Sequence, residues 1–123
     1  PKYKEWAQKN FSLNQLSSPS FKFYDMDSFD YLLYAKKKGL QFDIILCDPP
    51  SFSRSKKGQF QIDRDYGKLL EMSLAVLAPG GELLFSTNYE QWNASQWMQK
   101  IRINKALQTL EIKDNFSESR VLY

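Results

Sequence analysis

Four stretches of the chain carry apolar residues at intervals of three and four, the spacing that is typical of amphipathic helices. The second stretch is well delimited, because Asp27 or Ser28 can cap its start and Gly39 follows a last turn rich in lysine. The pattern predicts helices over residues 3–16, 28–38, 64–77 and from Asn93 or Ser95 to about residue 107.

Short apolar runs bounded by turn residues separate these helices, as expected for strands. The clearest run is Phe42–Cys47, in which every residue except Asp43 is apolar. A tight turn is expected at Ala78-Pro79-Gly80-Gly81. Strands are predicted at residues 21–24, 42–47 and 83–85, with weaker candidates at 110–112 and 121–123. Because strands alternate with helices, we expect an α/β fold with a largely parallel sheet.

Asp48, Pro49 and Pro50 directly follow the run Phe42–Cys47. Proline has no N–H for a sheet ladder, and it pushes the preceding residue away from helical geometry. The pattern therefore predicts a stiff loop at the carboxyl end of a buried strand, the edge where open α/β sheets bind ligands. The polar residues 86–88 end the strand at 83–85 in the same way, so the two strand ends are predicted to form one crevice.

Composition narrows the classes of function. The chain has 123 residues, no histidine and one cysteine. Histidine-dependent triads, histidine metal sites and zinc–thiolate clusters are therefore excluded, and we expect no metal. A single cysteine cannot form an internal disulfide, which fits a cytoplasmic location. No apolar run approaches the ~18 residues of a membrane helix, so no membrane partner is expected.

The net charge of +3 and the pI of about 9.0 mildly favour a nucleic acid or another acidic partner. Part of the positive charge follows the proline loop, where residues 53–58 are polar and basic and are predicted to form a loop.

Motifs along most of the chain occur in an order that resembles a known family. The most specific segment is Asp48-Pro49-Pro50-Ser51-Phe52-Ser53-Arg54-Ser55-Lys56, although Asp-Pro-Pro by itself is common. The other matching segments are residues 3–14, 27–32, 63–66, 77–81 and 85–88. Together they resemble class I S-adenosylmethionine-dependent methyltransferases, and more narrowly the 23S rRNA guanine methyltransferases of the RlmK/RlmL type.

The resemblance implies a Rossmann-like sheet with flanking helices, S-adenosylmethionine as the methyl donor and 23S rRNA as the substrate. That family begins its fold with a strand, a Gly-rich turn and a second strand, and residues 1–123 start after these motifs. We therefore expect a partial methyltransferase domain that lacks its N-terminal strands. The 123-residue chain alone is expected to be inactive.

The resemblance also assigns roles in catalysis. Asp48 would accept hydrogen bonds from the cofactor or the target base, the carbonyls of Pro49 and Pro50 would orient the substrate, and Phe52 would stack on the base. The alternatives are that Asp48 only caps the next turn and that Phe52 is a core residue.

Binding residues follow from the same comparison. Met26, Asp27 and Asp48 would contact the cofactor, with Asp27 accepting from the adenine amino group. Asp25 is a rival for that role, and Asp27 can instead be a simple helix cap. Residues expected on the RNA side are Ser51, Arg54, Lys56, Lys57 and Asn88, with Arg64, Ser86 and Thr87 as further candidates. Alternatively, the basic residues form a solvated loop and the polar ones a strand-terminal turn.

Two other functions stay open. A cytosine-C5 methyltransferase needs a nucleophilic cysteine, and Cys47 lies inside the apolar run, where it is predicted to point into the sheet. A non-catalytic α/β module could use the basic loop to bind RNA.

Overall fold

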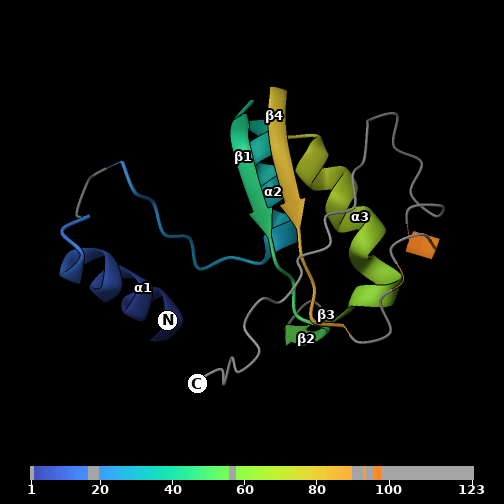
Figure 1. Ribbon diagram of the computed structural model, residues 1–123, viewed down its shortest axis with the longest axis horizontal. Coiled ribbons are helices and arrows are strands. Elements are labelled where there is room, and N and C mark those ends of the chain that lie inside the picture. The colour runs from blue at the N-terminus through green and yellow to red at the C-terminus, as the bar shows by residue number, and fades with distance from the viewer. Residues whose placement is uncertain (1, 17–19, 56–57, 90–92, 94–95, 98–123) are drawn as a thin grey trace, which may run out of the picture. The chain divides into compact units, whose positions relative to one another are not determined.

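The computed structural model describes residues 2–16, 20–55, 58–89, 93, 96 and 97. The chain forms two compact units, Pro1–Asn88 and Tyr89–Tyr123. The elements of the first unit are α1 (Lys2–Leu13), α2 (Ser28–Lys37), β1 (Phe42–Cys47), β2 (Phe52–Ser55), β3 (Gly58–Gln61), α3 (Ile62–Leu74) and β4 (Leu77–Phe85) (Figure 1).

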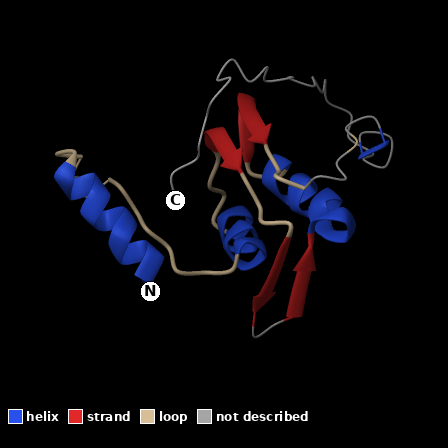
Figure 2. Cartoon of the chain, turned by 60° about the horizontal axis from the view of Figure 1, so that its bottom comes forward, coloured by secondary structure: helices blue, strands red, loops and turns tan. Residues whose placement is uncertain are grey.

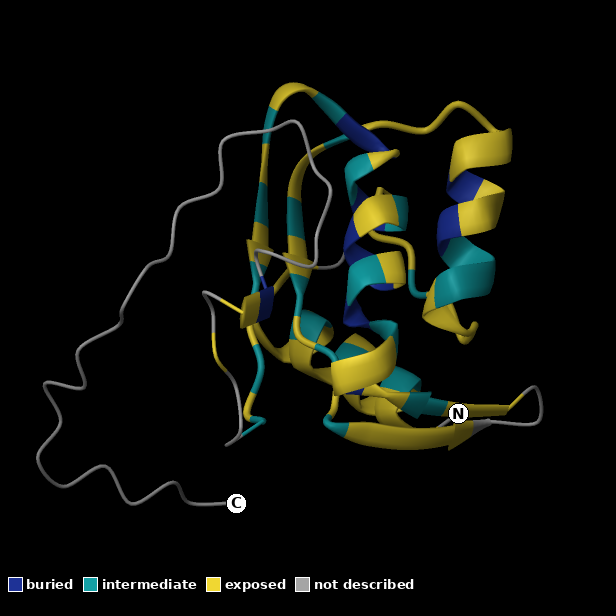
Figure 3. Cartoon of the chain, turned by 90° about the vertical axis from the view of Figure 1, so that its right-hand side faces the viewer, coloured by how far each residue is buried: buried dark blue, intermediate teal, exposed yellow. Residues whose placement is uncertain are grey.

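Strands β1 and β4 form a parallel pair, as the α/β pattern predicts. Residues 44–47 lie opposite residues 82–85. Helices α2 and α3 both lie on one side of this pair (Figures 1 and 3). The core fills the space between them, with buried residues Leu32, Ala35, Leu69 and Val76 and partly buried neighbours from both strands. This packing sets the carboxyl ends of β1 and β4 side by side.

The opposite face of the β1–β4 pair carries exposed apolar side chains together with the exposed Glu82, which pairs with Ile44. The exposed fractions are 69% for Ile44, 75% for Leu46 and 47% for Leu84. No element within the described residues covers these side chains. Exposed apolar side chains gathered on one face are typical of surfaces that another part of a protein or a partner covers.

The predicted turn at residues 78–81 is a bulge within β4. Phe42 lies opposite Leu77, whereas Ile44 already lies opposite Glu82, so β4 carries extra residues between the two pairs. Gly80 has a φ of 78°, which favours glycine. A Cβ atom on Gly81 would lie 2.8 Å from the backbone oxygen of Asp43. Glycine therefore lets the backbone bulge and return to the ladder.

Residues 52–55 and 58–61 pair as the antiparallel strands β2 and β3, called the hairpin below (Figure 2), whereas the sequence predicted a polar loop at 53–58. That prediction was wrong because both strands, β2 and β3, are mostly polar and exposed, so they lack the apolar signal of a core strand. The hairpin continues directly into α3.

Two other element predictions were also wrong in detail. Residues 21–24 do not form the predicted strand; instead, the rings of Phe21 and Phe23 lie 5.1 and 5.0 Å from that of Phe11. Helix α3 begins and ends earlier than predicted. It ends early because Val76 and Leu77 are buried, Val76 in the connection to β4 and Leu77 as the first residue of β4. Helix α2 and strand β1 have nearly the predicted bounds.

Little of the second unit is described. The backbone N–H of Gln96 donates to the side-chain oxygen of Asn93 (3.0 Å), which agrees with a helix start at Asn93. The rest of that predicted helix and the strands predicted at 110–112 and 121–123 lie outside the described residues. In the part of the chain that the structure describes, no helix has the length and apolar character needed to cross a membrane.

Candidate functional site

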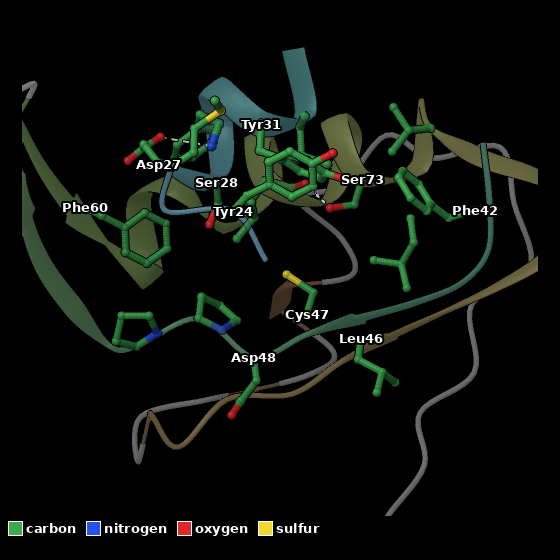
Figure 4. Close-up of a pocket in the computed structure, with 18 of the residues that line it drawn as sticks. Tyr24, Asp27, Ser28, Tyr31, Phe42, Leu46, Cys47, Asp48, Phe60 and Ser73 are labelled. Atoms are coloured by element: carbon green, nitrogen blue, oxygen red, sulfur yellow. Dashed lines mark hydrogen bonds between the residues drawn. The ribbon is translucent and has the colours of Figure 1, made fainter. Parts of the chain in front are cut away.

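A pocket of about 540 Å³ lies beside β1 and the start of α2 (Figure 4). Its lining includes residues 44–50 from both faces of β1 and the loop beyond, but none from β4. The pocket therefore follows the edge of β1 that faces away from β4. That edge has no partner strand among the described residues.

The carboxylate of Asp48 is held against the end of β4. The Ser86 hydroxyl donates to Asp48 Oδ1 at 2.7 Å, and the Ser86 backbone N–H donates to the carbonyl of Cys47 at 3.0 Å. Asp48 and Ser86 are neighbours because Cys47 pairs with Phe85 in the parallel register. The two strand ends therefore lie side by side, as predicted, but Ser86, Thr87 and Asn88 do not line the pocket, which follows the other edge of β1.

A second link fixes the far end of the proline loop. The Ser51 hydroxyl donates to Asn88 Oδ1 at 3.0 Å, and the Ser51 carbonyl accepts from the backbone N–H of Ile62 at 3.0 Å. Between these links lie Pro49 and Pro50, which line the pocket. A loop with restricted φ angles and both ends bonded is well suited to hold a substrate in one orientation.

Asp27 caps α2 and also lines the pocket. Its Oδ1 accepts from the backbone N–H groups of Phe29 (2.9 Å) and Asp30 (3.4 Å). Both cap bonds use the same oxygen. Met26 lines the pocket as well, whereas Asp25 does not. Asp27 therefore acts as the cap of α2, and its carboxylate also lies at the pocket.

Two tyrosines that the sequence reasoning did not select form a wall of the pocket. The rings of Tyr24 and Tyr31 lie 4.8 Å apart, and both residues line the cavity. Burial and the neighbouring tyrosines raise the pKa of Tyr31, so its hydroxyl stays protonated. Tyr31 follows the Asp27 cap by four residues, and this helical spacing places both residues on one side of α2. The same spacing in the sequence could have identified Tyr31 as a pocket residue.

Cys47 is a poor nucleophile in this structure. Burial raises the pKa of its thiol, the adjacent Asp48 raises it further, and a hydrogen bond with Ser73 lowers it in part. The side chain packs against the core cluster. Figure 4 shows that the Cys47 side chain points toward Tyr31, whereas the Asp48 side chain points away from Tyr31. Because the thiolate is the reactive form, this environment does not activate the cysteine.

The structure does not bring the predicted stacking and RNA-side residues together in one place. Ser51 and Asn88 meet at the end of the proline loop. Phe52 and Arg54 lie on the hairpin, outside the lining of the pocket, with the Arg54 guanidinium 5.4 Å from the Phe52 ring centre. Lys56 and Lys57 lie outside the described residues. Arg64 is bonded to Asp65 and to the backbone of the hairpin.

No protein-family model matches the chain. Among curated proteins, it is 40% identical over 92 residues to the ribosomal RNA large subunit methyltransferase K/L of Marinomonas sp. (strain MWYL1), covering 73% of this chain and 12% of that protein. It is 33% identical over 121 residues to the ribosomal RNA large subunit methyltransferase K of Neisseria meningitidis serogroup B, covering 97% of this chain and 34% of that protein. This chain is a homologue of part of the K/L-type rRNA methyltransferases.

Solved structures agree with this homology. The protein SMU.776, solved in complex with SAH, superposes with a TM-score of 0.69 at 37% identity, over 75% of this chain and 24% of that one. A SAM-dependent methyltransferase from Agrobacterium tumefaciens superposes with a TM-score of 0.71 at 23% identity, over 80% of this chain and 32% of that one. The Rossmann-like methyltransferase fold expected from the motifs is confirmed. The chain spans about a third or less of each of these four proteins.

Proposed function

We propose that this chain is the substrate-side part of an S-adenosylmethionine-dependent methyltransferase that acts on a guanine of 23S rRNA. One observation carries the proposal. Asp48, Pro49 and Pro50 end β1 beside a pocket, and Ser86 holds the carboxylate of Asp48 in one orientation. The methyltransferase class and the rRNA substrate come from the names of the homologues.

The pocket has the chemistry that an adenosyl group requires. Tyr24, Tyr31 and Met26 offer apolar and aromatic surface for a flat ring. Asp27 places a carboxylate beside them, and both of its cap bonds use Oδ1, so Oδ2 can accept from an amino group. Bound S-adenosylmethionine would supply a methyl group made electrophilic by the adjacent sulfonium. The residues of this chain that would hold it are Met26, Asp27 and the loop at Asp48.

The proline loop would orient the methyl acceptor. For an amino group, the Asp48 carboxylate and the carbonyls of Pro49 and Pro50 can accept the N–H bonds and direct the nitrogen lone pair toward the methyl group. Guanine N7 already carries a free lone pair and has no proton to lose. For that target, positioning alone supplies the acceleration. In both cases a rigid loop with a fixed carboxylate is the useful feature.

The cytosine-C5 alternative is disfavoured by Cys47. That reaction needs a thiolate that adds to the base, and the raised pKa of Cys47 keeps the thiol protonated. Its side chain also lies on the opposite side of β1 from the Asp48 carboxylate (Figure 4).

The test replaces Asp48 by alanine in the complete gene product. Transfer of labelled methyl from S-adenosylmethionine to unmodified 23S rRNA should fall by about 100-fold or more, because the acceptor is no longer aligned. Asp43→Ala is the matched control, since Asp43 is an exposed acid on the same strand, away from the loop. Circular dichroism should show that both variants fold. Normal turnover in the Asp48 variant would remove this residue from the active site.

A further inference from the structure

The β2–β3 hairpin has one face that points away from the pocket. Residues directly opposite each other in an antiparallel pair share a face. Phe52 pairs with Gln61 and Arg54 pairs with Gln59, so these four side chains form one surface, here named the outer face. All four are exposed.

The other face of the hairpin is attached to the body of the domain. Ser53 pairs with Phe60, and both residues line the pocket. The Phe60 ring lies 6.2 Å from that of Phe29 and packs against the core cluster. Because side chains alternate along a strand, this anchoring turns the outer face toward solvent, as Figure 3 shows by the exposed colouring of the hairpin.

The base of the hairpin is held rigidly. The backbone N–H of Gln61 donates to Asp65 Oδ2 at 2.9 Å, and the Arg64 guanidinium donates both to the carbonyl of Gln59 and to Asp65. The Ile62 backbone N–H donates to the carbonyl of Ser51. The outer face is thus presented in a defined orientation without a ligand, which lowers the entropy cost of binding one.

We propose that the outer face of the hairpin binds an unpaired RNA base next to the target nucleotide, with Phe52 as the stacking surface and Arg54 as the phosphate contact. The proposal rests on the proposed function, because it assumes an RNA substrate. It assigns Phe52 to a neighbour of the target base rather than to the target itself.

The chemistry of the outer face matches a single-stranded nucleotide. Phe52 is 45% exposed, and an exposed aromatic ring can stack on any base. The Arg54 guanidinium lies over one face of the Phe52 ring, 5.4 Å from its centre, so a base would stack on the other face of the ring while its phosphate meets the guanidinium. The carboxamides of Gln59 and Gln61 can bond to the edge of the base. A duplex keeps its base faces stacked and would not fit.

The position of the face explains why the neighbouring base is bound. Phe52 follows Pro50, which lines the pocket, by two residues. Two residues of extended chain span at most about 7 Å. Phe52 itself does not line the pocket. A strand whose target base enters at the proline loop would therefore pass over the outer face with the adjacent nucleotide.

The experiment measures the affinity of the complete gene product for a short single-stranded RNA of mixed sequence and for the matching duplex, by fluorescence anisotropy. Phe52→Ala should weaken single-strand binding roughly 5- to 150-fold with an unchanged salt slope. Phe52→Tyr should restore it. Arg54→Ala should weaken binding and reduce the salt slope by about 0.7. Lys37→Ala is the matched control for charge, because it lies at the end of α2 that precedes β1.

Equal affinity in the Phe52→Ala and Lys37→Ala variants would overturn the proposal, as would an equal loss for single strand and duplex. A loss of binding that Phe52→Tyr does not restore would also overturn it and indicate a structural role. Failure of the proposed function looks different. In that case the wild-type protein transfers no methyl group to 23S rRNA, whereas the affinity difference at Phe52 can still be measured.

Discussion

Ser86→Ala tests whether the orientation of Asp48 matters for methyl transfer. In the folded chain the Ser86 hydroxyl donates to Asp48 Oδ1 at 2.7 Å, a short hydrogen bond to a charged acceptor. Alanine removes the hydroxyl and leaves the backbone bond from Ser86 to the Cys47 carbonyl in place. The variant therefore frees one carboxylate without breaking the pairing of β1 with β4.

The substitution should affect the rate of methyl transfer much more than the stability of the fold. Both side chains are exposed, so water replaces the lost bond and the free energy of unfolding should change by less than about 1 kcal/mol. Catalysis depends on geometry, and a misplacement of about 1 Å can cost on the order of 100-fold in rate. Since the proline loop still restrains Asp48, we expect a loss of roughly 10-fold in kcat, with little change in KM for RNA.

The assay compares kcat and KM of the wild-type gene product with those of Ser86→Ala and Ser86→Thr. Threonine keeps a hydroxyl and should recover most of the rate. Thermal denaturation should give a similar Tm for all three proteins. An unchanged kcat in Ser86→Ala would refute the positioning role, and a raised KM alone would place Ser86 in RNA binding instead.

Four further outcomes are expected. Calorimetric titration of the 123-residue chain with S-adenosylmethionine should show no tight binding, and a submicromolar Kd would contradict this. Replacing Lys56 and Lys57 together by alanine should weaken RNA binding and lower the slope of log affinity against log salt concentration by about 1.4. An unchanged slope would show that the two lysines do not contact phosphates. Cys47→Ala should leave methylation of 23S rRNA intact, and its abolition would revive the cysteine mechanism. The hydrogen bond from Arg64 holds the pKa of Asp65 below its usual 3.8, so the stabilisation is complete above that pH and is lost as the pH falls below it. The Asp65→Asn variant should lack this loss of stability at low pH, and the same fall in stability with pH for the variant and the wild type would rule the contribution of Asp65 out.

Local signals were enough to predict some elements closely. Helix α2 has an Asp27 cap and a Gly39 with a φ of 66° just beyond its end. Both features act within a few residues and do not depend on the rest of the fold. Strand β1 has the predicted bounds because Asp48 and the two prolines end its apolar run.

Other elements depend on contacts between distant segments. Val76 and Leu77 continue an apolar helical pattern, yet both are buried and Leu77 pairs with Phe42 in the sheet. Tertiary packing therefore ends α3 early and starts β4. Strands β2 and β3 have no local apolar alternation, and their pairing is anchored by Phe60, which packs against the core, and by the bond from Gln61 to Asp65.

The sequence by itself determined which groups end β1, because the Asp48-Pro49-Pro50 motif and its surroundings specify a rigid acidic loop and resemble one family. Only the tertiary structure decided which side chains meet there. Ser86 reaches Asp48 across 38 positions, and Ser51 reaches Asn88 across 37. These contacts follow from the parallel register of β1 and β4, and a shift of one residue would turn every side chain to the other face. Phe52, which the motif associates with the pocket, lies instead on the outer face of the hairpin, because it pairs with Gln61 in the antiparallel register of β2 and β3.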